Sequence, residues 1–243
     1  MRFDNLNSPC PDMLYLVPSP LSQKTPKHPL LAADLPLVQQ CNTWLVENAK
    51  PARAALGHFN MPVAIRELQI LEIAQLSSQQ RQDVIQRCKA GQAVAVMSDA
   101  GCPGVADPGA EIVALAHKLG CPVHPLVGPS SILLALMGSG LNGQNFRFYG
   151  YPPLDAAQRD AWIKQTERES KAQQCTQIVI ETPFRNEKLI EALLKQLSDT
   201  TLLCIGWDLT GDEQHIHTKT VGQWKKQLPT PGKSPCLFLW LSA

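Results

Sequence analysis

The run Ala93-Val94-Ala95-Val96-Met97 leads into Ser98-Asp99-Ala100-Gly101-Cys102-Pro103-Gly104-Val105-Ala106-Asp107-Pro108-Gly109 and then into Ala110–Leu119. The first run is apolar and contains β-branched residues, which is typical of a buried strand. Ala110–Leu119 is apolar at helical spacing and is followed by Gly120, which predicts a helix. Three glycines and two prolines separate them, so the chain must turn sharply from strand to helix. In an open α/β sheet such a loop lies at the carboxyl end of a strand, where ligands bind.

Two interpretations of this loop are open on its local pattern. It is either a β–α connection that turns sharply, or a ligand-binding loop. It lacks the Gly-Lys-Ser/Thr of a phosphate-binding P-loop and the Gly-x-Gly-x-x-Gly of a dinucleotide-binding turn. A nucleotide held mainly by backbone groups remains compatible with it.

Composition bounds the class of protein. The chain has 243 residues, of which 44% are hydrophobic and 18% charged, which is typical of a soluble globular protein with one large or two modest domains. The net charge of +1 is unlike that of a strongly basic nucleic-acid binder, although a local patch can suffice. No apolar run approaches the roughly 20 residues that a membrane helix needs, and Met1–Asp12 is polar, which predicts no signal peptide. We therefore expect a cytoplasmic protein that does not enter a membrane.

The cysteines and histidines do not form a metal-binding pattern. The eight cysteines are scattered, without a Cys-x-x-Cys, and we expect reduced core residues. Cys102 lies on the central loop, where a nucleophilic role would require a nearby base. His215 and His217 alternate in an expected strand, and two histidines on a solvated face are the preferred interpretation. We expect no metal site.

The first half of the chain alternates strands and helices, which predicts an α/β domain over residues 13–127 with a largely parallel sheet. Residues 65–74 are ambiguous. Strands are expected at Met13–Val17, Thr43–Val46, Ala93–Met97 and Val123–Val127, and helices at Leu30–Gln40 (broken near Pro36), Ala52–Phe59, Gln79–Ala90 (capped by Ser77) and Ala110–Leu119.

The second half, residues 128–243, is richer in strands and predicts an α+β domain with a mixed sheet. It opens on Gly128-Pro129-Ser130-Ser131, where the serines either cap a short apolar helix, Ile132–Met137, or meet a polar ligand. Further strands are expected to begin at Phe146 and to span Gln177–Ile180, Leu202–Gly206 and Cys236–Leu241, with helices at Ala156–Gln173, Leu189–Leu197 and Val221–Gln227.

A family resemblance rests on these segments. Ser98–Gly109 resembles the S-D-A-G-T-P-x-I-S-D-P-G loop of the tetrapyrrole methylase superfamily, and more narrowly the branch that methylates a ribose 2′-hydroxyl of small-subunit ribosomal RNA. Further segments match in the same order: Leu14–Pro20 (L-Y-x-V-x-T-P), Gly128–Ser131 (G-P-S/C-A/S), Phe146–Pro153 (F-x-F-x-G-F-L-P), Glu181–Arg185 (E-S-P-H-R) and Asp208–Thr210 (E-L-T).

The resemblance implies a two-domain enzyme, usually a homodimer, that binds S-adenosylmethionine in a cleft between its domains. An RNA ribose is the implied acceptor; the S-D-A-G form of the loop, unlike the G-D-P form of the porphyrin and corrin branches, makes a tetrapyrrole the weaker alternative. The cofactor contacts that carry over are Pro18, Asp99, Ala100, Gly101, Pro103, Gly104, Ser130, Ser131, Glu181, Thr182, Pro183, Thr210 and Thr220.

The departures from the family pattern concentrate on its charged positions. The family's G-N-L is here Ser22-Gln23-Lys24, and its E-D-T-R is Glu47-Asn48-Ala49-Lys50. Its lysine after F-L-P is Asp155, its histidine in E-S-P-H-R is Phe184, and its arginine before E-L-T is Trp207. Loss of basic residues removes charge that could hold RNA phosphates. Two hypotheses follow: a methyltransferase whose acceptor has diverged, or a degenerate protein that binds S-adenosylmethionine or its demethylated product without turnover.

Candidate catalytic residues on the acceptor side are Glu47, with Asn48 and Lys50 beside it; the alternative is a solvated loop. Asp99 and Asp107 are expected to brace the central loop. Arg185 is expected to pair with a carboxylate or a phosphate. A further choice stays open for the aromatic side chains that follow residue 145, which either stack on a base or pack in a core: Phe146, Phe148, Tyr149 and Tyr151.

Overall fold

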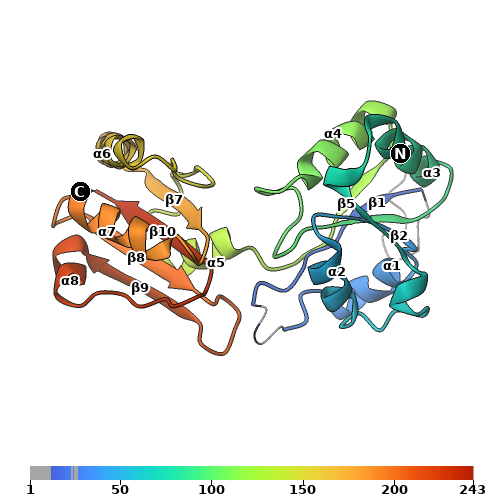
Figure 1. Cartoon of the computed structure of the whole chain (residues 1–243), viewed down its shortest axis with the longest axis horizontal. Helices are drawn as coiled ribbons and strands as arrows, with labels where there is room; N and C mark the ends of the chain where they lie inside the picture. The colour runs from blue at the N-terminus through green and yellow to red at the C-terminus, as the bar shows by residue number, and fades with distance from the viewer. Residues whose placement is uncertain (1–11, 23, 25–26, 243) are drawn as a thin grey trace. The chain divides into compact units, whose positions relative to one another are not determined.

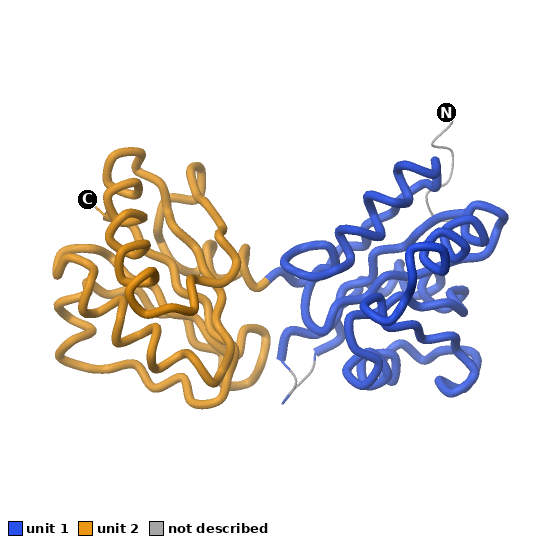
Figure 2. Tube along the Cα trace, turned by 45° about the horizontal axis from the view of Figure 1, so that its top comes forward, with its two compact units in different colours: residues 1–130 blue, residues 131–243 orange. Residues whose placement is uncertain are grey.

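The computed structural model describes residues 12–22, 24 and 27–242. The chain divides into two compact units, the first ending at Ser130 and the second beginning at Ser131 (Figures 1 and 2). The predictions for Met1–Pro11, Gln23 and Ala243, including that for Cys10, lie outside the described residues. The α/β class with two sheets, one parallel and one mixed, is confirmed.

Unit 1 is built on a five-stranded parallel sheet in the order β3-β2-β4-β1-β5. The interior strands are apolar except at Thr43, the first residue of β2, because helices cover both faces of the sheet. β5 ends at Pro125, which an edge strand tolerates. The strands are β1 (Leu14–Leu16), β2 (Thr43–Val46), β3 (Gln69–Glu72), β4 (Val94–Met97) and β5 (Val123–Pro125).

The helices of unit 1 mostly follow the sequence pattern. α3 (Ser78–Lys89) begins at a capping box in which the Ser77 side chain accepts from the backbone N–H of Gln80, as expected for Ser77. α4 (Gly109–Leu119) ends at Gly120, whose φ is 70°. The prediction for α2 (Ala49–Leu56) was three residues late at its start, because Pro51 lies in the first turn and does not stop the helix.

Two other segments of unit 1 differ from expectation. Leu30–Gln40 is not a broken helix: a 3₁₀ turn at Ala32–Asp34 precedes α1 (Leu35–Gln39), and Pro36 lies in the first turn of α1. The ambiguous stretch resolves into β3 between two 3₁₀ turns, Ile65–Glu67 and Ile73–Gln75. Each piece is too short for periodicity to identify it.

The alternation of side chains along the strands divides the interior of unit 1 into two cores. Tyr15, Trp44 and Met97 belong to one cluster of buried residues, and Leu14 and Leu45 to the other. All five side chains are at most 1% exposed. A one-residue shift of register would exchange the two sets, so the apolar pattern specifies the pairing.

Unit 2 carries a five-stranded mixed sheet in the order β6-β7-β10-β8-β9, in which β6 and β7 are parallel and the other pairs antiparallel. Trp240 and Phe238 on the central strand are fully buried. The strands are β6 (Phe146–Phe148), β7 (Thr176–Glu181), β8 (Leu202–Trp207), β9 (His215–Thr220) and β10 (Cys236–Leu241).

The helices of unit 2 are α5 (Ser131–Ser139), α6 (Ala156–Gln173), α7 (Asn186–Gln196) and α8 (Val221–Lys226). α6 has the predicted bounds. Its N-cap is Asp155, whose carboxylate accepts the backbone N–H of Gln158 (2.9 Å). Asp155 followed three residues later by Gln158 is itself a sequence signal for the start of a helix.

Within the described part of the chain the cysteines have free thiols, and all are buried except the half-buried Cys102. Burial raises the pKa of the Cys41 thiol to about 12 and that of Cys236 to about 12, which agrees with inert core residues. No helix in the described ranges is long and apolar enough to cross a bilayer.

A backbone contact in unit 1 gives a stability prediction. A Cβ on Gly128 would lie 2.2 Å from Cβ of Pro18, whereas a Cβ on Gly143 would meet nothing within 4 Å. We expect Gly128→Ala to lower the free energy of unfolding by about 1–3 kcal/mol, because the new methyl group overlaps the Pro18 ring, which cannot rotate away. Gly143→Ala should change it by less than about 0.5 kcal/mol. Urea unfolding of both variants measures this, and equal stabilities would contradict it.

Candidate functional site

Four segments of unit 1 meet at the carboxyl edge of its sheet. β1, β4 and β2 are parallel neighbours, so the residues that follow Leu16, Val46 and Met97 emerge at the same edge. The chain that follows β5 also arrives there, because Gly128 packs on Pro18. This is the edge at which open α/β sheets bind ligands.

The loop after β1 and the loop after β4 are joined by backbone hydrogen bonds. The N–H of Ser19 donates to the carbonyl of Gly101 (2.9 Å), and the N–H of Gly101 donates to the carbonyl of Ser19 (3.1 Å). Gly101 has a φ of 74°, and a Cβ there would lie 2.9 Å from the Leu21 side chain. The pairing therefore requires glycine at position 101.

Asp107 braces the central loop, as expected. Its carboxylate accepts the backbone N–H of Gly104 at both oxygens (3.0 and 2.9 Å) and that of Gly109 (2.6 Å). These bonds hold the turn ahead of α4 and occupy the carboxylate, so Asp107 is a structural residue and not a free base.

The neighbouring residues Glu47 and Asn48 form one polar cluster with Asp99, which is distant from them in sequence. The amide of Asn48 donates to Asp99 through Nδ2 to Oδ2 (2.7 Å), and its backbone N–H donates to Oδ1 (3.2 Å). The backbone N–H of Asp99 in turn donates to Oε2 of Glu47 (3.2 Å). Asn48 precedes α2 but makes no cap bond, because its side chain turns to Asp99. An aspartate at position 48 would place its carboxylate against that of Asp99, whereas the amide of Asn48 can donate a hydrogen bond to it.

The environment of Glu47 favours its protonated form. Burial raises the pKa of the Glu47 carboxyl, and the negative charges of Asp99 and Asp107 raise it further, against the lowering effect of the Asp99 N–H. A carboxylate whose pKa is raised toward neutrality is a better proton acceptor at neutral pH. Lys50 is exposed in the first turn of α2 and has no partner within the described chain.

Cys102 is not arranged as a nucleophile. Its Sγ lies 3.4 Å from the carbonyl oxygen of Pro129 and 3.7 Å from that of Gly128. Burial raises the pKa of the thiol. A thiol that faces carbonyls and has a raised pKa stays protonated, which argues against a catalytic thiolate.

The backbone of the central loop offers groups that a polar ligand can use. The N–H groups of Ala100 and Cys102 make no hydrogen bond within the described residues. Gly104, with a φ of 86°, has open space where a Cβ would lie. Unpaired backbone donors beside a side-chain-free surface fit a compact, charged nucleoside cofactor.

The candidate residues of unit 2 do not all lie at one edge of its sheet. Glu181 ends β7 and Trp207 ends β8, and both pair with Cys236 of β10, so Thr182, Pro183 and Thr210 follow strand ends at one edge. Thr220 pairs with Leu202 at the opposite end of β8. There its hydroxyl accepts from the N–H of Gln223 in the capping box of α8, a structural role.

Arg185 pairs with a carboxylate, which the sequence had left open. Its Nε donates to Oε1 of Glu181 and to Oγ1 of Thr182 (3.3 Å). Its guanidinium carbon lies 5.6 Å from the ring centre of Tyr151. Burial raises the pKa of Glu181, while the charge of Arg185 lowers it. Oε2 of Glu181 is buried without a partner in the described structure.

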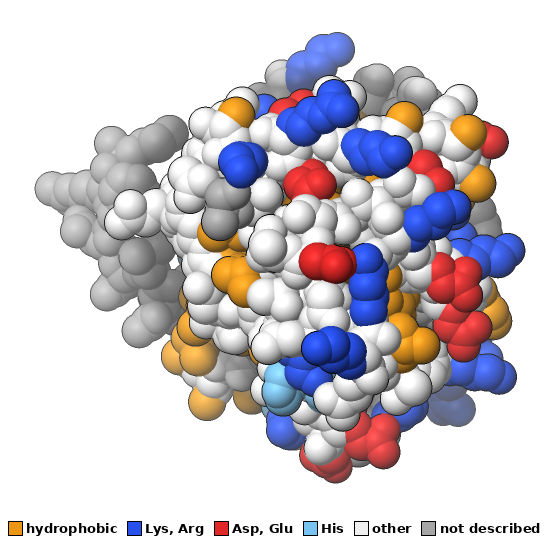
Figure 3. All heavy atoms as spheres, turned by 90° about the vertical axis from the view of Figure 1, so that its left-hand side faces the viewer, with side chains coloured by type: hydrophobic (Ala, Val, Ile, Leu, Met, Phe, Trp, Pro, Cys, Tyr) orange, Lys and Arg blue, Asp and Glu red, His pale blue; other side chains and the backbone are white. Residues whose placement is uncertain are grey.

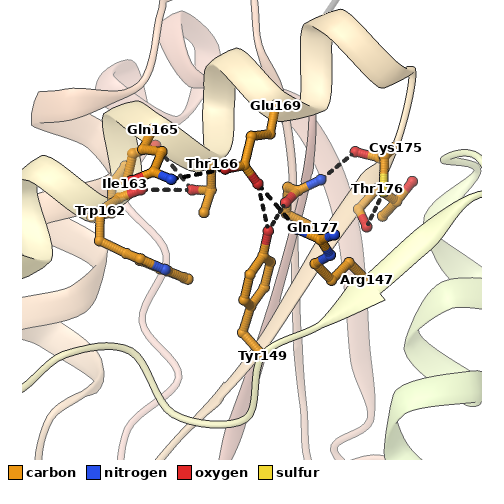
Figure 4. Close-up of polar contacts among 10 residues, drawn as sticks. All are labelled: Arg147, Tyr149, Trp162, Ile163, Gln165, Thr166, Glu169, Cys175, Thr176 and Gln177. Atoms are coloured by element: carbon orange, nitrogen blue, oxygen red, sulfur yellow. Dashed lines mark hydrogen bonds and ion pairs between the residues drawn. The ribbon is translucent and has the colours of Figure 1, made fainter.

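The aromatic residues weighed for base stacking divide into two kinds. Tyr149 is a network residue: its hydroxyl donates to Gln177 (2.6 Å) and contacts Glu169 (3.2 Å), and its ring lies edge-on to Trp162 (Figure 4). Tyr151 is different, because 52% of it is exposed.

The two histidines of β9 belong to a stack of rings. His215 lies 3.7 Å from Trp207, centre to centre, and His217 lies 5.0 Å from His215. Burial lowers the pKa of His215, helped by His217 and Lys219. Within the described ranges no group of three or more His, Cys, Asp or Glu is placed to hold a metal ion.

Solved structures of this architecture include a uroporphyrin-III-C-methyltransferase from Thermus thermophilus, which matches 94% of this chain and 91% of its own with a TM-score of 0.54 at 17% identity. A cobalt precorrin-4 methyltransferase matches 99% of this chain and 98% of its own, with a TM-score of 0.59 at 14% identity. The model of the family "Tetrapyrrole (Corrin/Porphyrin) Methylases" matches residues 37–225, and the chain belongs to this family.

Relatives with closer sequences carry one name, "Ribosomal RNA small subunit methyltransferase I". The protein from Mesorhizobium japonicum is 36% identical over 57% of this chain and 46% of its own length. That from Halalkalibacterium halodurans is 28% identical over 79% of this chain and 60% of its own length. The matches thus span about half of these relatives.

The polar cluster yields a pH prediction. Because the folded-state pKa of Glu47 is raised, its ionisation opposes folding, and this effect grows as pH rises through that pKa. Glu47→Gln should therefore be more stable than the wild type at pH 7–8, and the difference should disappear below about pH 4. Urea unfolding across pH, beside the exposed-site control Glu67→Gln, measures it. A pH-independent difference would contradict the prediction.

Proposed function

We propose that the chain is an S-adenosylmethionine-dependent methyltransferase. The observation that carries the proposal is the carboxyl edge of the unit 1 sheet, where the Asp99–Gly104 backbone leaves N–H groups unpaired beside the Glu47–Asn48–Asp99 cluster. Family membership and the relatives' printed names support the same activity.

In this proposal the loop residues hold the cofactor, which supplies a methyl group on a sulfonium leaving group. Ala100 and Cys102 donate backbone N–H groups to it, and Gly101 and Gly104 allow its close approach. Pro18 and Ser130 lie on the neighbouring loops, and in unit 2 Glu181–Pro183 and Thr210 are further contacts. Thr220 has no part in it, because its hydroxyl caps α8.

Glu47 is the proposed proton acceptor for the hydroxyl that is methylated. Its raised pKa suits this role at neutral pH, and the Asp99 N–H orients it. Asn48 holds Asp99 in place, and Lys50 supplies a positive charge at the same edge. Proton removal of this kind contributes typically 10²–10⁴-fold to a rate.

The proposed acceptor is a ribose of small-subunit ribosomal RNA. The relatives' names support the RNA, and the ribose oxygen rests on the motif resemblance. On the face drawn in Figure 3, basic and acidic side chains are interspersed without one large basic patch. RNA recognition in this proposal is therefore local. Association of two copies remains a prediction.

A second candidate is a cofactor-binding protein without turnover. It is favoured by positions where the family's charged groups are replaced, since Asp155 caps α6 and Trp207 stacks on His215. It shares the cofactor site, so cofactor binding does not distinguish the two.

Transfer of an isotope-labelled methyl group distinguishes them. The purified protein is incubated with labelled S-adenosylmethionine and small ribosomal subunits that lack the modification, and the RNA is digested and analysed by mass spectrometry. A labelled 2′-O-methylnucleoside, absent with Glu47→Ala, supports the proposal. Cofactor binding with no transfer to RNA supports the non-enzymatic alternative.

Two glycines provide a matched test of the cofactor site. Gly104 and Gly232 both have positive φ (86° and 60°), and neither has an atom within 4 Å of its built Cβ. Leucine at either position should cost a similar 1–2 kcal/mol of backbone strain. Only Gly104→Leu should weaken S-adenosylmethionine binding, by about tenfold or more, in calorimetric titration. An equal loss at both positions would place the cofactor elsewhere.

A further inference from the structure

Two family departures lie at or beside one edge of the unit 2 sheet. Phe184 follows β7 and Trp207 ends β8, and both strands meet Cys236 of β10 at this level. The resemblance places a histidine at 184 and an arginine at 207, so two cationic or titratable groups have become aromatic rings. Tyr151 reaches the same edge, because the carbonyl of Gly150 accepts the N–H of Ile180 beside it (3.0 Å).

The planar groups at this edge are exposed or stacked. Phe184 is 88% exposed, the highest value among the large apolar residues that the structure describes, and it lies in the turn that the N–H of Arg185 closes onto Thr182 (3.0 Å). Since exposing a phenyl ring to water is unfavourable, a ring fixed on a short turn is suited to a partner. The neighbouring strand end carries the Trp207–His215 stack.

Arg185 adds a cation of fixed orientation. Glu181 and Thr182 hold its Nε, and its guanidinium lies over Tyr151, while Nη1 and Nη2 have no partner in the described structure. A guanidinium anchored at one nitrogen presents the other two as a fork that matches a phosphate. Exposed acidic side chains also follow these strand ends: Glu187 lies in α7 beside Lys188, and Asp212 and Glu213 lie in the loop between β8 and β9.

We propose that this edge binds unpaired nucleotides of the RNA acceptor, with a base stacked on Phe184 and a phosphate held by Arg185. The proposal rests on the proposed function for its choice of RNA. Single-stranded nucleic acid is recognised by aromatic stacking together with cationic contacts to its backbone, and both kinds of group are present here. Aromatic rings stand at two positions where the family pattern has charged or titratable side chains. In this proposal base stacking therefore contributes more to the affinity for RNA than phosphate contacts do.

The test uses the full-length protein and a fluorescent single-stranded hexamer of uridine, measured by anisotropy without cofactor. Phe184→Ala should weaken binding about tenfold, Phe184→Leu should weaken it similarly because it lacks a π face, and Phe184→Tyr should retain it. Leu228→Ala, at another exposed apolar residue of unit 2, is the matched control and should bind as the wild type does.

Arg185 is tested by Arg185→Lys, which keeps the charge but loses the planar fork, and it should weaken binding several-fold. Arg168→Lys on the exposed face of α6 is the control. Circular dichroism checks the fold of each variant, because Arg185 pairs with the buried Glu181.

Two results of the binding assay overturn the proposal: wild-type protein that does not bind the hexamer, or Phe184→Ala that binds it unchanged. Neither decides the proposed function, which the methyl-transfer assay tests separately. Methyl transfer by Phe184→Ala at the wild-type rate would remove this edge from the acceptor site and leave the activity intact. If the protein binds the hexamer in a Phe184-dependent way but transfers no methyl group, the proposed RNA-binding edge is supported and the methyltransferase activity is refuted.

Discussion

The close backbone contact between the loops after β1 and β4 is the constraint on which the candidate site depends. The paired hydrogen bonds of Ser19 and Gly101 leave no room for a side chain at 101, and Gly128 meets Pro18 under the same restriction. The polar cluster depends on a further backbone pairing, because β2 and β4 are parallel neighbours that bring Glu47 beside Met97 and so place the Asp99 N–H within reach of the Glu47 carboxylate. Backbone packing therefore brings these residues together, and the side chains of Glu47, Asn48 and Asp99 complete the cluster.

Much of the fold could be predicted from local pattern. β4, its loop and α4 were predicted because periodicity and glycine punctuation agree there, and α6 was predicted to the residue because no glycine or proline interrupts it. Prediction failed where one residue type is compatible with two different local structures. Pro36 was expected to break a helix, whereas it lies in the first turn of α1, where proline is tolerated. Pro51 lies in the first turn of α2 in the same way, ahead of the start expected at Ala52.

The site was predictable loop by loop but not contact by contact. Motifs identified the loops, yet the bond from Asn48 to Asp99 joins residues 51 apart and has no local signature. The position of Thr220 depends on the register of β8 and β9, which the sequence does not reveal. The Trp207–His215 stack likewise arises from cross-strand pairing, which the apolar periodicity of the sequence does not predict.

Asp155 shows how a change of site can become difficult to reverse. The carboxylate that stands where the resemblance places a lysine now holds the first turn of an 18-residue helix. A return to lysine would remove the cap and bring a positive charge to the positive end of the helix dipole, so the two costs would add. The lysine of the family pattern would therefore cost helix stability at this position, whatever the ligand requires. The first turn of α6 thus favours a carboxylate at position 155 independently of any role in binding.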